Sequence, residues 1–306
     1  MKQFAIFRQT TTGFRVFLLI FLLLLLTLLS ILSAALICSF VFKVPLSDLE
    51  SLTDGENGIY IAKIVQIISQ IGVFILPPLL FAILVSEKPL RLLGINNRTG
   101  LLFPLLGIVV MFSILPLIHQ LTELNESIRL PSFMKQIEYW MQEKEKQAGE
   151  ISLKFLAAST LGGLSLNLLM IGILPAVGEE LLFRSILQPL FGKILRNHHF
   201  GILVSAILFS MMHMQFYGFF PRVALGLLLG YFYLWSGSIL IPMLMHFVNN
   251  GSAVVIFYLS HNGYIETKAD EFGATSNSSI LFVSILATAG LVYLAYRNKK
   301  SPEYQA

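Results

Sequence analysis

Long apolar stretches recur along the whole chain. The first runs from Val16 to Phe42, and seven more lie at about 61–85, 101–122, 154–191, 200–217, 220–236, 238–261 and 279–296. A stretch of about 18 apolar residues is long enough to cross a bilayer as a helix. The chain is 56% hydrophobic and only 12% charged, whereas an ordinary soluble domain has about 25% charged residues. The sequence therefore predicts an all-α fold, a polytopic transmembrane helical bundle of about eight spanning helices.

The charges between the apolar stretches fall into two groups. Basic residues dominate the N-terminus, 86–100, 192–199 and 297–300, whereas acidic residues dominate 43–60, 123–153 and 262–278. Basic connections lie on the cytoplasmic side of membrane proteins. We therefore expect an integral protein of a bacterial-type cell membrane with both termini in the cytoplasm. The first stretch is too long for a signal peptide and lacks a cleavage pattern, so we expect it to remain as a spanning anchor.

One polar insertion of some size, residues 123–153, interrupts the apolar pattern. Its segment 136–141 has apolar residues at helical spacing, and Tyr139 and Trp140 suit the headgroup zone of a membrane. This pattern allows two interpretations, a helix lying on the outer membrane surface or a solvated helical cap. The net charge of +4 is compatible with lipid headgroups and does not indicate nucleic acid.

The fourth stretch contains three neighbouring charges, Glu179, Glu180 and Arg184. A charge at the centre of a spanning helix costs about 2.5 to 3.5 kcal/mol on insertion scales. Glu180 and Arg184 are four residues apart and can pair on one helix face, but Glu179 points about 100° away. Glu179 is therefore the charge that needs another explanation. Pro175 in the same stretch predicts a bend.

Two histidines lie well inside later stretches, His213 in the fifth and His246 in the seventh. Each has a companion four residues away on the same helix face, Phe209 for His213 and Asn250 for His246. A lone histidine in an apolar helix is more often a satisfied core residue. At about 1.5 Å per residue, however, both histidines and Glu179 reach similar depths, in the cytoplasmic half of the bilayer or near its middle. The three residues can therefore meet in one site.

Such a site suits hydrolysis by two routes. A carboxylate and an imidazole can activate a water, and a second imidazole with an amide can stabilise an oxyanion. Alternatively, Glu179, His213 and His246 could be three ligands of a metal such as zinc, with water in the fourth position. The pattern His-Glu-x-x-His is absent, so no local motif demands zinc.

Three motifs in order resemble the CPBP family of intramembrane endopeptidases, which includes the type II CAAX prenyl endopeptidases, the bacteriocin-processing enzymes and the Abi proteins. They are Glu179-Glu180-x-x-x-Arg184, Phe209-x-x-x-His213 and His246-x-x-x-Asn250. The resemblance covers about 154–262 and implies that the chain hydrolyses a peptide bond of a membrane-associated polypeptide.

By the same resemblance, Glu179 and His213 would activate the water, and His246 with Asn250 would hold the oxyanion. Glu180 and Arg184 would form a supporting ion pair. The neighbouring Asn249 competes with Asn250 for the inward position, although the four-residue spacing favours Asn250. The metal-free mechanism is favoured, so no cofactor is expected, with a divalent metal such as zinc as the alternative.

The resemblance also divides the chain. We expect accessory transmembrane helices and the outer loop in 1–153, the catalytic helical core in 154–262, and the last transmembrane helix with a cytoplasmic tail in 263–306. Two other functions remain open. Glu and His in a membrane are also the parts of a proton-coupled carrier, although no internal repeat supports that function. The chain could also be a non-catalytic scaffold or immunity protein with the same fold.

Overall fold

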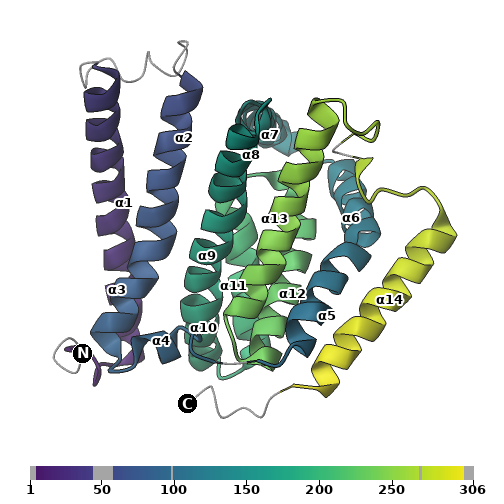
Figure 1. The fold of residues 1–306 in the computed structure, drawn as a ribbon. Helices are drawn as coiled ribbons and strands as arrows, with labels where there is room; N and C mark the ends of the chain where they lie inside the picture. Colours follow the sequence, from purple (N-terminus) through teal and green to yellow (C-terminus); the bar gives the residue numbers. More distant parts are fainter. Residues whose placement is uncertain (1–4, 44–57, 98, 269–270, 300–306) are drawn as a thin grey trace.

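The computed structural model describes residues 5–43, 58–97, 99–268 and 271–299, and all regular secondary structure in this part of the chain is helical. The helices pack side by side in a bundle (Figure 1). The α-helices of the N-terminal part are α1 (Thr12–Phe42), α2 (Gly58–Ser69), α3 (Leu76–Val85), α4 (Pro89–Leu92), α5 (Leu102–Ser113), α6 (Leu115–Ser127) and α7 (Lys135–Leu156). Those that follow are α8 (Leu161–Asn167), α9 (Leu174–Glu180), α10 (Gln188–Ile194), α11 (His198–Met212), α12 (Phe219–Ser236), α13 (Leu240–His261) and α14 (Ser278–Arg297).

The expected membrane bundle is confirmed. Within the described residues, six helices are long and apolar enough to cross a membrane: 12–42, 58–85, 161–194, 216–236, 240–261 and 278–297. The pair α5 and α6 makes a seventh if it is counted as one span, although the pair is bent by 46°. Pro116 stands in the first turn of α6, where its missing N–H breaks the helix. The helix α11 is apolar but has only 15 residues.

Three π-helical turns, η4 (Gln70–Ile75), η6 (Leu168–Ile173) and η7 (Leu181–Leu187), interrupt the long helices. Each is followed by a proline in the first turn of the next α-helical segment, at Pro77, Pro175 and Pro189. A proline ring clashes with the carbonyl four residues before it, and a wider turn relieves that clash. The helix runs without a break from Leu161 to Ile194, through Pro175, because the π-helical turn before the proline accommodates its ring. The bend predicted at Pro175 stays a prediction.

Two other predicted boundaries were wrong. The fourth apolar stretch begins at Leu161, because Lys154 to Leu156 belong to the end of α7. The fifth stretch ends at Met212, where the backbone turns at His213 and continues into the short 3₁₀ helix η8 (Phe216–Gly218). Apolar composition continues across both breaks, so hydropathy alone did not locate them.

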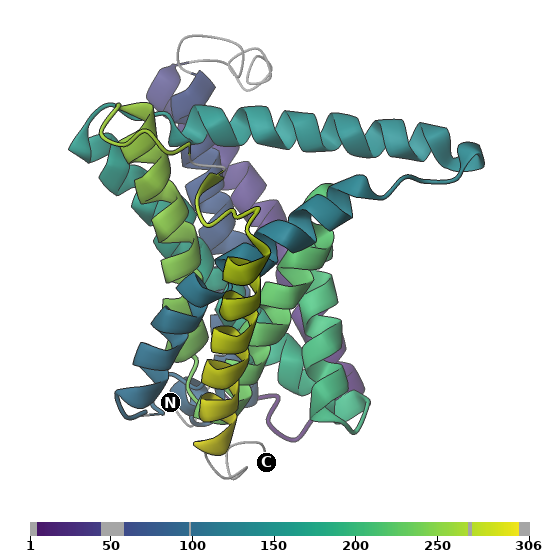
Figure 2. The same cartoon turned by 90° about the vertical axis from the view of Figure 1, so that its right-hand side faces the viewer.

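The two ends of the bundle differ. The start of α1, the end of α14, α4 and the end of α10 lie at one end, and α7 lies at the other (Figure 1). This arrangement groups the basic segments around Lys88, Arg91, Lys193 and Arg196 with the two terminal helix ends, as the charge pattern predicted. Figure 2 shows that α7 runs across the bundle rather than along it.

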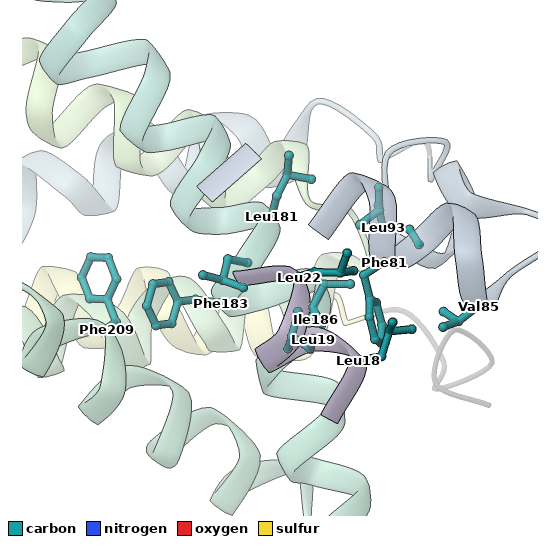
Figure 3. Close-up of a cluster of buried hydrophobic side chains, with 12 residues drawn as sticks. Leu18, Leu19, Leu22, Phe81, Val85, Leu93, Leu181, Phe183, Ile186 and Phe209 are labelled. Atoms are coloured by element: carbon teal, nitrogen blue, oxygen red, sulfur yellow. The ribbon is translucent and has the colours of Figure 1, made fainter. Parts of the chain in front are cut away.

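The N-terminal helices pack directly on the helix that carries the three charges. Leu18, Leu19 and Leu22 of α1 and Phe81 of α3 form one buried cluster with side chains of η7 and α11 (Figure 3). The members from η7 and α11 are Leu181, Leu182, Phe183, Ile186 and Phe209. The helices α1 and α3 therefore support the predicted catalytic core.

Candidate active site

Glu180 and Arg184 form the predicted ion pair. Arg184 Nε lies 3.0 Å from Glu180 Oε2, and the side chains are 1% and 0% exposed. The guanidinium carbon also lies 4.8 Å from the ring centre of Phe209, a cation–π geometry. A buried charge is tolerated when it is paired and held by further contacts, so this pair accounts for two of the three charges.

Glu180 also binds His246, which the sequence did not predict. His246 Nδ1 lies 2.8 Å from Glu180 Oε1. The carboxylate of Glu180 therefore joins the guanidinium of Arg184 on η7 to the imidazole of His246 on α13. Because a carboxylate accepts a hydrogen bond, Nδ1 carries a proton. The other ring nitrogen, Nε2, then faces Asn250 and Glu179.

Asn250 is the amide at His246. Its Nδ2 lies 3.3 Å from His246 Nε2 and donates to the carbonyl of Ile171 at 3.0 Å. Asn249 Nδ2 donates to Asn250 Oδ1 at 3.0 Å and thereby orients the Asn250 amide. Of the two neighbouring asparagines, Asn250 lies at the imidazole and Asn249 lies behind it.

Glu179 is buried beside this group but is not tightly bound. Its Oε2 lies 4.0 Å from His246 Nε2 and has no hydrogen-bond partner among the described residues. Its Oε1 accepts a long hydrogen bond of 3.4 Å from Gln70 Nε2 of η4. A polar separation of about 4 Å is the distance that one water can bridge.

Gln70 is the site residue that the sequence analysis missed. It lies outside the predicted core of 154–262 and is only 6% exposed. Gly178 makes its approach possible, because a Cβ at that position would lie 2.8 Å from Phe74 and clash with η4. In the sequence, Gln70 is a single amide within an apolar stretch, and such a residue does not indicate a site until the fold is known.

The structure brings His213 near the group but not into contact with Glu179. His213 stands at the C-terminal end of α11, where its Nδ1 lies 2.9 Å from the carbonyl oxygen of Phe209. The residue is exposed, and its ring makes no hydrogen bond to Glu179 or His246 among the described contacts. Phe209 links the two histidines, because its ring centre lies 5.0 Å from that of His213 and 5.9 Å from that of His246.

A metal at this group has no ready set of ligands. Among the described residues, no three His, Cys, Asp or Glu side chains lie together as a metal site would require. The three ligands considered in the sequence, Glu179, His213 and His246, are therefore not assembled as a coordination sphere. Whether hydrolysis depends on a metal stays a prediction.

Two hollows on the described surface lie away from this group. One is formed by residues 87–91 with Asn96 and Asn97, and the other by residues around His119, Glu123 and Glu271. Neither is lined by Glu179, His213, His246 or Asn250, so the candidate site is defined here by its buried contacts.

The fold and the site define an integral membrane protein with a buried acid–imidazole–amide group on neighbouring helices. Residues 162–252 match the family described as type II CAAX prenyl endopeptidase Rce1-like. The matched segment contains all three motifs, so the resemblance seen in the sequence is confirmed. This match supports a membrane function of the CAAX protease type.

A curated relative aligns with part of the chain. It is the uncharacterized protein YpbD of Bacillus subtilis (strain 168), which is 29% identical over 86 residues. The alignment covers 27% of this chain and 41% of that protein, so the chain matches less than half of the relative's length. No solved structure matches the chain.

Proposed function

We propose that this protein is an intramembrane endopeptidase that hydrolyses a peptide bond of a membrane-associated polypeptide. The observation that carries the proposal is the unsatisfied, buried Oε2 of Glu179, 4.0 Å from His246 Nε2. A buried carboxylate oxygen without a partner is costly. A water between the two atoms would satisfy it and would also be the nucleophile of a hydrolytic reaction.

In this mechanism Glu179 accepts a proton from the water as the water attacks the substrate carbonyl, and His213 assists. The carbonyl becomes a tetrahedral oxyanion, which Asn250 Nδ2 stabilises by donating a hydrogen bond. His246 Nε2 donates a second hydrogen bond when the imidazole carries a proton on both ring nitrogens and the Glu180 carboxylate balances its charge. Glu179 then gives the proton that it took from the water to the leaving nitrogen, which completes the cleavage and restores the carboxylate. The contact between Glu180 and His246 Nδ1 at 2.8 Å supports this assignment, because it turns Nε2 toward Glu179 and Asn250.

The site lies within the membrane bundle, so the substrate has to come from the membrane or its surface. We propose that the end of the bundle that carries the terminal helix ends faces the cytoplasm, because the basic connections gather there. The name of the matching family suggests a prenylated C-a-a-X end as one substrate to try.

The direct test uses purified full-length protein in proteoliposomes with two fluorogenic peptides. One peptide ends in a farnesylated C-a-a-X sequence, and the other has the same sequence on a transmembrane anchor. We expect cleavage of at least one peptide by the wild type and a loss of about a thousandfold for Glu179→Gln. Glu138→Gln, a change in α7 at a distance from the site, is the matched control and should cleave normally.

Terminal mapping of the membrane proteome extends the test to natural substrates. New N- and C-termini that depend on the protein should disappear in cells carrying Glu179→Ala. Proton flux through wild-type proteoliposomes that stops in Glu179→Gln, without cleavage of any peptide, would instead establish the carrier function. Complementation of a deletion by Glu179→Ala would establish the scaffold.

A further inference from the structure

The turn that carries His213 is held from three sides. We call residues 213–218 the His213 turn. It connects α11 to α12 and includes Met214, whose φ of 53° is left-handed. A residue with a side chain rarely adopts that conformation, and it persists only where neighbouring groups fix it. The position of His213 therefore depends on whatever holds this turn.

Arg222 of α12 holds the turn from inside. Its Nη1 donates to Gln215 Oε1 at 3.1 Å, and its Nη2 donates to the backbone carbonyl of Gln215. The guanidinium lies so close to Gly218 that a Cβ there would meet Nη1 at 2.6 Å. A planar guanidinium can make these contacts together, which a lysine cannot.

The helix α7 holds the turn from outside. Glu145 Oε2 accepts a hydrogen bond of 3.3 Å from the backbone N–H of Tyr217, and Glu145 interacts electrostatically with Arg222. The ring centre of Trp140 lies 5.2 Å from that of Phe216. Because α7 runs across the bundle (Figure 2) and contains no buried residue, these contacts are among the few that fasten it.

A third contact comes from α6. Asn125 Nδ2 donates to the carbonyl of Phe216 at 3.0 Å, and its Oδ1 accepts from the backbone N–H of Phe220 at 2.9 Å. Asn125 is 6% exposed and bridges the start of η8 and the first turn of α12. It fixes the exit of the turn, whereas Arg222 and Glu145 act nearer to His213.

We propose that Arg222 and Glu145 are positioning residues for His213. Through Glu145, the helix α7 sets where the imidazole of His213 lies relative to Glu179. The proposal rests on the proposed function, because it gives these contacts a role in water activation. Neither side chain has a described contact with Glu179, His246 or Asn250, so both act through His213. Loss of the contacts made by Arg222 or Glu145 would move the imidazole of His213 and slow the chemical step without changing the substrate contacts elsewhere.

The first experiment measures kcat and KM with the farnesylated and anchored peptides in proteoliposomes. Arg222→Gln and Glu145→Ala should each lower kcat by about 10- to 100-fold with little change in KM, because a small displacement of a catalytic group has effects of this size. Glu145→Gln keeps an oxygen acceptor for Tyr217 N–H and should lose less. Glu150→Ala, on the same helix and exposed, is the matched control with unchanged kcat.

The second experiment combines each change with His213→Ala. If Arg222 and Glu145 act through His213, then Arg222→Gln or Glu145→Ala will not lower kcat further in the His213→Ala background. Equal losses in both backgrounds would overturn the proposal, since they would show a structural effect elsewhere. If His213→Ala and Glu179→Gln both cleave normally, the proposed function itself has failed.

A third measurement does not depend on activity. Diethyl pyrocarbonate modifies accessible imidazoles, and mass spectrometry reports the rate at each histidine. Arg222→Gln and Glu145→Ala should change the modification rate of His213 and leave that of His261 unchanged. Unchanged His213 reactivity in both variants, with a wild-type melting temperature, would refute the proposal.

Discussion

The carboxylate of Glu180 bridges Arg184 and His246, at 3.0 Å and 2.8 Å respectively. The sequence analysis gave Glu180 and Arg184 only a supporting role, but Glu180 is in direct contact with the candidate catalytic imidazole of His246. Glu180 balances a buried cation on its own helix and fixes the ring of His246 on another. These two roles can be separated by experiment.

Removing Glu180 should damage stability and activity together. In Glu180→Ala the guanidinium of Arg184 stays buried without its partner, which costs about 3 to 5 kcal/mol. The double variant Glu180→Leu with Arg184→Met removes both charges and should recover the melting temperature in detergent. It should still cleave the fluorogenic peptides about a hundredfold more slowly, because His246 Nδ1 has lost its acceptor. Full activity in the stable double variant would show that Glu180 serves stability alone.

Asn250 and Asn249 should differ sharply in their effect on cleavage. Asn250→Ala removes the amide at His246 Nε2 and should lower kcat by about 100- to 1,000-fold, the range seen when one oxyanion donor is lost. Asn249→Ala removes only the contact that orients Asn250 and should cost about tenfold. Parallel kcat measurements decide between them. A larger loss in Asn249→Ala would reassign the oxyanion donor.

The sequence predicted the parts of the site that depend on one helix. Helical spacing paired Glu180 with Arg184 and placed Asn250 on the face of His246, and the cost of a charge in lipid drew attention to Glu179. These inferences need only the period of a helix and the apolar surroundings.

The remaining contacts depend on how separate helices pack, which periodicity does not report. Gln70 reaches Glu179 across 109 positions of the sequence, and His246 reaches Glu180 across 66. The end of α11 at Met212 was also missed, because the left-handed Met214 and the bonds from Arg222 create that turn within an apolar stretch. The orientation of α7 was left open by its composition and is visible only in the fold.

Metal removal tests the mechanism favoured by the sequence. Because the described residues offer no cluster of three metal-ligating side chains, we expect peptide cleavage to survive dialysis against EDTA and 1,10-phenanthroline within about twofold. The measurement is the initial rate before and after chelation, with added zinc as a further arm. A loss that zinc restores would assign Glu179 and the histidines as ligands that gather only with the ion.

Gln70 should tune the reactivity of Glu179 from outside the segment that matches the family. Gln70→Leu removes the 3.4 Å hydrogen bond to Glu179 Oε1 while keeping a side chain of similar size. We expect kcat to change by about tenfold, the effect of losing one hydrogen bond to a charged group. Gln66→Leu, one helical turn away on α2, is the control and should behave as the wild type. Equal kinetics for both variants would remove Gln70 from the site.

Lys63 is a further buried charge, and the proposed mechanism does not use it. Its Nζ donates to Asn167 Oδ1 at 2.9 Å, and the residue is 9% exposed, with no carboxylate bound to it among the described residues. Holding an ammonium in such a place costs free energy. Lys63→Met keeps most of the volume and removes that cost, and Asn167 retains its bond to the carbonyl of Leu156. We therefore expect the melting temperature in detergent to rise by about 2 to 4 °C, corresponding to roughly 1 kcal/mol, whereas Lys63→Ala should lower it by leaving a void. A melting temperature that falls in Lys63→Met would show that the ammonium contributes net stability through the amide of Asn167.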